Sequence, residues 1–182
     1  MGALKDAGVT FSQPSPVVGE QEGCGIAFPV KLSSVRAGKV EVKLPGAPVL
    51  NCAFALRLSR WVAGSAAPII AYQTGSTLKA VATGPGYQCR RRNRSKTGKL
   101  SEHAVGNAID ITGFIAGDGA RFAVEKRASG TKAEKQLLTA LSTTGCGYFS
   151  TVLGPGSNAA HDTHFHFDHA KRGKNWNYRL CE

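Results

Sequence analysis

Apolar and polar residues alternate with a period of two in three parts of this chain, which predicts strands. The clearest case is 163–168, Thr-His-Phe-His-Phe-Asp. The segment Ala-Ile-Asp-Ile at 108–111 has the same pattern and belongs to a predicted strand at 108–114. The segment 40–44 also alternates and predicts a short strand. Residues two apart on a strand share a face, so each of these segments has one polar side and one apolar side.

Helical spacing appears in two other places. Asn51 can cap a largely apolar segment at 52–63, which we expect to form a buried helix. Thr131 and Glu134 make a capping box, and leucines follow at helical spacing as far as Gly145.

The remaining apolar segments predict further strands. We expect 69–73 and 78–83 to form a hairpin across 74–76, and 146–153 to form a strand near the end of the chain. Helices and hairpins therefore alternate irregularly, which predicts an α+β class with a central antiparallel sheet flanked by helices.

The length of 182 residues and the apolar content of 42% fit one domain with a sizeable core. We interpret 1–22, with Pro14 and Pro16, as a flexible lead or surface strap and 23–182 as the domain. The longest apolar stretch, 66–72, is broken by Pro68 and is too short to span a bilayer. No transmembrane segment is expected.

The five cysteines are widely spread, and no two form a C-x-x-C pair. This argues against a cysteine zinc site and favours long-range disulfides in an oxidising compartment over a cytosolic protein with buried thiols. We predict two disulfides and one free thiol. The pairing that we select is Cys24 with Cys52 and Cys89 with Cys181.

The net charge is +11, and the densest basic run lies at 90–96. Nucleic acid is the usual partner of such a run. However, this run contains no interleaved aromatic residues, and the chain has no recognisable nucleic-acid motif. No nucleic-acid partner is therefore expected, and a polymer that carries free carboxylates is an equally good electrostatic partner.

Histidines and a carboxylate gather in two short segments some fifty residues apart, 101–110 and 161–166. His164 and His166 would point into one cleft, and Asp110 would project opposite its apolar neighbours. His103 precedes the strand of Asp110 on a glycine-containing loop, which can fold back over a metal ion. An isolated H-x-H is common and uninformative, but the two segments together predict a metal site. Two histidines and one carboxylate leave a coordination position for water, as in catalytic zinc sites.

The motif S-x-H-x-x-G-x-A-x-D, followed by H-x-H, resembles that of the zinc peptidases of bacterial cell walls. These include D-Ala-D-Ala dipeptidases and carboxypeptidases, the penicillin-insensitive murein endopeptidase, and the related zinc fold of hedgehog signalling domains. The wider pattern resembles the bacterial extensin-like C-terminal domain over nearly all of 24–181. The matching stretches are 24–30, 51–53, 87–90, 101–110, 148–155, 161–168 and 178–181.

The resemblance implies an antiparallel sheet with Zn²⁺ in a cleft on its surface. The matched positions make His103, Asp110 and His166 the expected zinc ligands. His164 is then expected to act as a base or an electrostatic stabiliser, and Arg90 to hold a substrate carbonyl or the developing oxyanion.

Thr163 departs from the dipeptidase pattern, which places a general-base glutamate at this position. The spacing H-x-x-H-x-H, formed by His161, His164 and His166, matches the penicillin-insensitive endopeptidase instead. Proton transfer is therefore expected to fall to His161 or His164.

The resemblance thus implies a zinc metallopeptidase, a hydrolase that cleaves peptidoglycan cross-links or stem peptides of DD or LD type with metal-activated water. It also implies export to the periplasm or cell envelope, although 1–6 lack the basic and apolar regions of a signal peptide. One alternative is an inactive zinc-containing domain that binds the cell wall or acts as a scaffold. Another is a metal-dependent nuclease or phosphoesterase, suggested by the arginine run.

Overall fold

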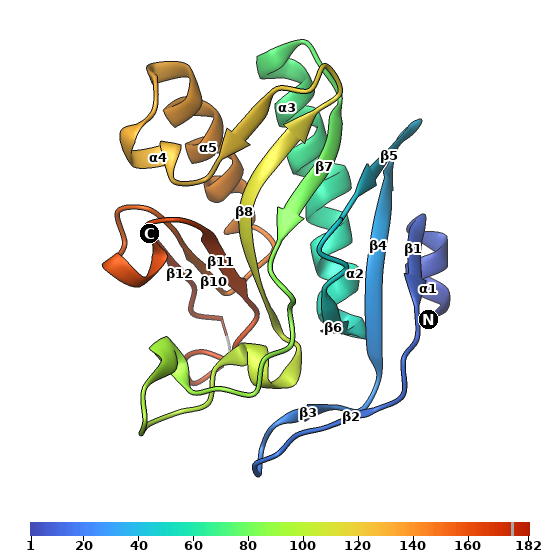
Figure 1. The fold of residues 1–182 in the computed structure, drawn as a ribbon, viewed down its shortest axis with the longest axis vertical. Coiled ribbons are helices and arrows are strands. Elements are labelled where there is room, and N and C mark those ends of the chain that lie inside the picture. The colour runs from blue at the N-terminus through green and yellow to red at the C-terminus, as the bar shows by residue number, and fades with distance from the viewer. Residues whose placement is uncertain (176) are drawn as a thin grey trace.

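A large mixed sheet forms the centre of the protein in the computed structural model, which describes residues 1–175 and 177–182. The strands are β1 (Val9–Ser12), β2 (Val17–Val18), β3 (Gly25–Ile26), β4 (Pro29–Ala37), β5 (Val40–Lys43), β6 (Val49–Asn51), β7 (Leu78–Thr83), β8 (Ala108–Ala116), β9 (Arg121–Ala123), β10 (Thr151–Leu153), β11 (Phe165–Asp168) and β12 (Leu180–Cys181). Their order in the main sheet is β1-β4-β5-β7-β8-β11-β10-β12, with β6 beside β4 and β9 beside β8 (Figure 1).

Most neighbouring strands are antiparallel, but β5 with β7 and β10 with β12 are parallel. The predicted class of helices around one central sheet is therefore confirmed, whereas the purely antiparallel sheet is wrong. The reason lies in the connections. A helical segment separates β5 from β7, and a long loop returns the chain to β12, so the two strands of each pair can run in the same direction.

The helices are α1 (Gly2–Asp6), α2 (Cys52–Trp61), α3 (Ala67–Thr74), α4 (Lys126–Ser129) and α5 (Lys132–Gly145). A π-helical segment, η1 (Val62–Ala66), joins α2 to α3, and three short 3₁₀ segments are η2 (Arg92–Arg94), η3 (Glu102–Val105) and η4 (Ala159–His161). The segment from α2 to α3 forms one continuous column beside the sheet, and α5 lies against α3 (Figure 1).

Both predicted helix starts are confirmed. The side chain of Asn51 accepts a hydrogen bond from the Phe54 backbone N–H at 2.8 Å, which caps α2. Thr131 and Glu134 form the reciprocal capping box at the start of α5.

The predicted strand at 69–73 is wrong, because this segment belongs to α3. Pro68 is the second residue of α3, directly after the π-helical segment, and the helical column continues from α2 through it. Gly75 has a left-handed φ of 71° and ends the helix, so the glycine is a helix cap rather than a hairpin turn. The second half of the predicted hairpin is confirmed as β7.

The predicted strand at 146–153 shortens to β10, because the chain leaves α5 through hydrogen-bonded turns at Cys146 and Gly147. The N-terminal segment 1–22 contains α1 and β1, and β1 pairs with β4 at the edge of the sheet. Leu4 is fully buried and Val9 is 7% exposed, so apolar side chains hold this segment on the core. The proposed division at residue 22 stays a prediction.

Aromatic side chains of the core support the strand that carries the second histidine segment. Phe165 and Phe167 on β11 are fully buried, as the alternation predicted. The ring of Trp61 on α2 meets that of Phe167 edge-on, with centroids 5.1 Å apart. Helix α2 therefore fixes β11 from behind while the other face of the strand remains available.

Two disulfides and one unpaired cysteine are present among the described residues, as predicted, but the selected pairing is wrong. The bridges are Cys24–Cys89 and Cys146–Cys181. Cys52 is the half-buried first residue of α2 and is unpaired. Only the fold brings the paired residues close, with Cα atoms 5.5 and 6.0 Å apart, and sequence spacing does not carry this information. None of the helices in the described part of the chain is long and apolar enough to cross a membrane.

Candidate metal centre and active site

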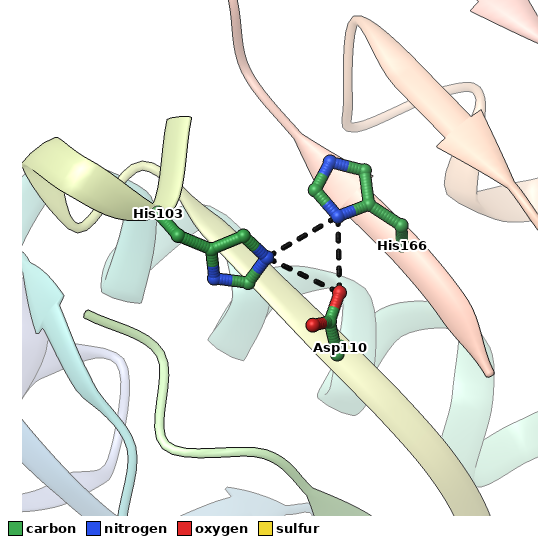
Figure 2. Close-up of side chains that lie close together, drawn as sticks. All are labelled: His103, Asp110 and His166. Carbon is green, nitrogen blue, oxygen red and sulfur yellow. Dashed lines mark hydrogen bonds and ion pairs between the residues drawn. The ribbon is translucent and has the colours of Figure 1, made fainter. Parts of the chain in front are cut away.

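Two histidines and one carboxylate converge at the surface of the sheet (Figure 2). His103 Nε2 lies 3.2 Å from Asp110 Oδ1, and His166 Nδ1 lies 3.0 Å from the same oxygen. The two nitrogens are 3.3 Å apart. The structure thus brings together the three residues that the sequence analysis selected as metal ligands.

Strand pairing places two of the three ligands. Antiparallel β8 and β11 pair Asp110 directly with His166. The neighbours of Asp110, Ile109 and Ile111, are fully buried, so the carboxylate must project from the opposite face of the sheet. The predicted alternation on both strands is confirmed.

His103 reaches the site from η3, a single helical turn. The Ser101 hydroxyl caps this turn by accepting from the His103 backbone N–H, and Gly106 ends it with a φ of 63°. The ring of His103 is only 2% exposed, and its Nδ1 lies 2.6 Å from the carbonyl oxygen of Gly86. A Cβ atom at Gly86, where φ is 82°, would lie 2.5 Å from a backbone oxygen of Val49, so only glycine fits there.

The hydrogen-bond partners fix which ring nitrogens face the site. A carbonyl oxygen only accepts, so His103 Nδ1 donates to Gly86 and His103 Nε2 presents its lone pair. On the other ring, His166 Nε2 lies 3.2 Å from Asp168 Oδ2 and donates to it, which leaves Nδ1 for a metal ion.

The donor set fits a zinc ion. Two imidazole lone pairs and a carboxylate oxygen face one another at 3.0 to 3.3 Å, and a cation between them would satisfy all three. Ligands about 2.0–2.1 Å from zinc at tetrahedral angles lie roughly 3.3 Å apart. Each histidine also donates its second nitrogen to an oxygen, as metal-binding histidines typically do.

The electrostatics of the metal-free protein reflect the same convergence. Burial by itself would raise the pKa of Asp110, but its close polar contacts with His103 and His166 outweigh burial and hold that pKa well below its usual range. Burial by itself would lower the pKa of His166, but its bonds to Asp110 and Asp168 raise that pKa to about 9. A proton on His166 therefore takes the place of a metal cation between two carboxylates.

A cavity of about 500 Å³ opens beside the three ligands. It is lined by all three predicted catalytic residues, His161, His164 and Arg90. A space of this volume is large enough for a small substrate or a short piece of peptide.

His161 is 8% exposed and lies at the end of η4. Its Nδ1 is 2.8 Å from Asn158 Oδ1, which also accepts from the Ala160 backbone N–H and is therefore the amide oxygen. His161 thus carries its hydrogen on Nδ1 and leaves Nε2 free to accept a proton. Burial, followed by the repulsion that His166 and His164 exert when protonated, lowers the pKa of His161 to about 4, so the ring is neutral at pH 7.

His164 lies just before β11, with its Nε2 3.6 Å from Asp110 Oδ1. Burial lowers the pKa of His164, and Asp110 opposes this only in part. His161 and His164 have ring centroids 5.4 Å apart, so the two rings stand side by side near the ligands.

Arg90 immediately follows Cys89, whose disulfide to Cys24 anchors this segment. Its Nε donates to Gln88 Oε1 at 3.0 Å, and its Nη2 lies 3.8 Å from Asp110 Oδ2. The guanidinium therefore lies beside the three candidate ligands, and its role in holding a substrate carbonyl stays a prediction.

Sequence reasoning missed three residues that orient the site. Asp168 shares a strand face with His166 and could have been selected on that ground. Gly86 and Asn158 act through a backbone carbonyl and a local turn, for which the sequence carries no specific signal. His169 is exposed, and its backbone bonds to Asn107.

A family model described as "Extensin-like protein C-terminus" matches residues 1–182. The chain belongs to this family. The match confirms the wider resemblance found in the sequence, but it carries no activity, so the relation of this extensin-like chain to the zinc peptidases stays a prediction. No curated protein and no solved structure matched the chain significantly.

Proposed function

We propose that this protein is a zinc-dependent hydrolase that cleaves peptide bonds of peptidoglycan. The observation that carries the proposal is the set of three converging ligands beside a cavity that two neutral histidines line. The choice of peptidoglycan rests on the resemblance of the motifs to cell-wall peptidases. Export, which this substrate requires, is supported by the two disulfides, because such bonds persist in oxidising compartments.

His103, Asp110 and His166 would hold the ion. Zinc at this position supplies a Lewis acid that acidifies water and polarises a carbonyl group. His161 Nε2 is the best-placed proton acceptor, since Asn158 fixes the hydrogen on Nδ1 and the ring is neutral at pH 7. The Arg90 guanidinium orients the substrate carbonyl and stabilises the negative charge that develops on its oxygen.

The sharpest test is digestion of purified, cross-linked peptidoglycan, followed by mass spectrometry of the released muropeptides. We expect new cleavage products with zinc-loaded protein and none after chelation. Penicillin should not inhibit the reaction, because attack by water forms no acyl-serine for a β-lactam to trap. If prolonged incubation yields no new muropeptides, the hydrolase proposal is wrong.

One observation favours the alternative of an inactive wall-binding or scaffold domain. Each carboxylate that lines the cavity already has a partner: Asp110 and Asp168 bond to histidines, and Glu102 accepts from Asn107 Nδ2 at 2.6 Å. Catalysis therefore depends on a histidine base. An inactive protein that still co-sediments with peptidoglycan would support the alternative. Chelator-sensitive cleavage of nucleic acid would instead support a nuclease.

A further inference from the structure

Arg172 belongs to the wall of the metal cavity and had no assigned role. It follows β11 by four residues, and its side chain is 22% exposed. Its Nε donates to Thr151 Oγ1 on β10 at 2.8 Å, which fixes the plane of the guanidinium. Its nearest carboxylate oxygen among the described residues, Asp168 Oδ2, lies 3.9 Å from Nη2, beyond hydrogen-bond distance.

Both carboxylate oxygens of Asp168 have closer partners than Arg172. Its Oδ2 accepts from His166 Nε2, and its Oδ1 accepts from the Ala170 backbone N–H at 3.0 Å. Arg172 is therefore held in position by Thr151 while its terminal N–H groups are not committed to a carboxylate. Such a planar, pre-oriented group suits bidentate binding of a further carboxylate.

The charge of the cavity points the same way. Three guanidinium groups, of Arg90, Arg92 and Arg172, balance three carboxylates on its wall. The histidines on the wall add no charge when His166 binds metal and the other two are neutral. A divalent ion then leaves two positive charges in excess, which favours an anionic substrate. Arg92 is 45% exposed, and Arg90 stands against a metal ligand, so Arg172 is the better-shielded group for recognition.

We propose that Arg172 binds a substrate carboxylate close to the scissile bond and so selects acidic peptides. The inference rests on the proposed function, because it concerns the same cavity. Only one carboxylate and one imidazole ring separate the guanidinium from the ligand nitrogen of His166. The bound carboxylate therefore belongs to the cleaved residue or to a residue next to it in the peptide.

The test compares soluble muropeptides with intact carboxylates against the same muropeptides converted to carboxamides. Binding is measured by calorimetry on zinc-loaded His161→Ala protein, in which turnover should be too slow to disturb the titration, and cleavage is measured on wild-type protein. We expect the intact form to bind about 10- to 100-fold more tightly, the usual effect of a charge-assisted pair. Arg172→Gln should abolish this preference, whereas Arg121→Gln, at the exposed first residue of β9, should keep it.

Each outcome separates the two proposals. Cleavage without any preference for the intact form overturns the role of Arg172 and leaves the hydrolase standing. An Arg172-dependent preference in binding without any cleavage supports the role of Arg172 and overturns the hydrolase proposal. If Arg172→Gln weakens both forms equally and also weakens zinc binding, Arg172 acts only by positioning Asp168, and the inference is wrong.

Arg172→Lys is the second variant for this test if Arg172→Gln does not fold. Lysine keeps the charge but loses the planar fork, so part of the preference should remain. A lysine variant with the full preference, or with none, contradicts bidentate recognition.

Discussion

His166 and Asp110 lie directly opposite each other on antiparallel β11 and β8, with His166 Nδ1 3.0 Å from Asp110 Oδ1. The candidate metal centre therefore depends on the register in which β8 and β11 pair. A shift of one residue in either strand would turn one of the two side chains toward the core.

Asp168 should control how tightly the site binds metal, because it fixes the hydrogen of His166 on Nε2. We expect Asp168→Ala to weaken zinc binding about 10- to 100-fold, the usual effect of losing such a partner. Competition against a chromogenic chelator measures the affinity. Asp162→Ala, at an exposed position just after η4, is the control and should bind zinc normally. Unchanged affinity in Asp168→Ala would show that His166 is oriented by other contacts.

The two histidines of the cavity wall should serve turnover rather than metal binding. We expect His161→Ala and His164→Ala each to keep zinc and to lose about a hundredfold or more in turnover, as loss of general acid–base catalysis usually does. His169→Ala, at an exposed position, should keep normal turnover. Near-normal turnover in both of the first two variants means that the base lies elsewhere.

The metal-free protein should lose stability as the pH rises from about 6.5 to about 9. The folded-state pKa of His166 is raised from 6.5 to about 9, so the folded state holds this proton more tightly than the unfolded chain does. This contribution to stability is complete below the unfolded pKa and disappears as the pH passes the folded pKa. Thermal unfolding of chelated wild-type and His166→Gln proteins measures it as the difference between the two pH profiles. Parallel profiles would contradict the assignment.

The disulfides should stabilise the two segments that border the cavity. Cys89 precedes Arg90, and Cys181 follows the cavity residue Leu180. The bridges close loops of 65 and 35 residues, so the chain-entropy model gives each about 4 kcal/mol of unfolding free energy. Denaturant unfolding of Cys24→Ser and Cys146→Ser measures the loss, with Cys52→Ser as the matched control. A loss no larger than that of the control would show that the bridges do not hold the fold.

The alternation of apolar and polar residues located the site in the sequence, and the resemblance of the motifs selected the three ligands among its polar residues. Ile109, Asp110 and Ile111 signal one buried and one open face without any knowledge of the partner strand. The helix caps at Asn51 and Thr131 were equally local, and both were confirmed.

Features that depend on contacts distant in sequence could not be predicted. The apolar run at 69–73 is compatible with a strand or a helix, and only its continuity with α2 made it part of α3. Cys24 meets Cys89 only after the sheet has formed. The Gly86 carbonyl that orients His103 is a backbone group, which every residue type has, so the sequence does not indicate this contact.

Zinc content tests the metal centre most directly. Wild-type protein, reconstituted with zinc and dialysed, should hold about one zinc ion per chain in elemental analysis, since three ligands converge on one position. His166→Ala should hold almost none, while His164→Ala, two residues away, should match the wild type. A full complement of zinc in His166→Ala, or none in the wild type, would contradict the proposed centre.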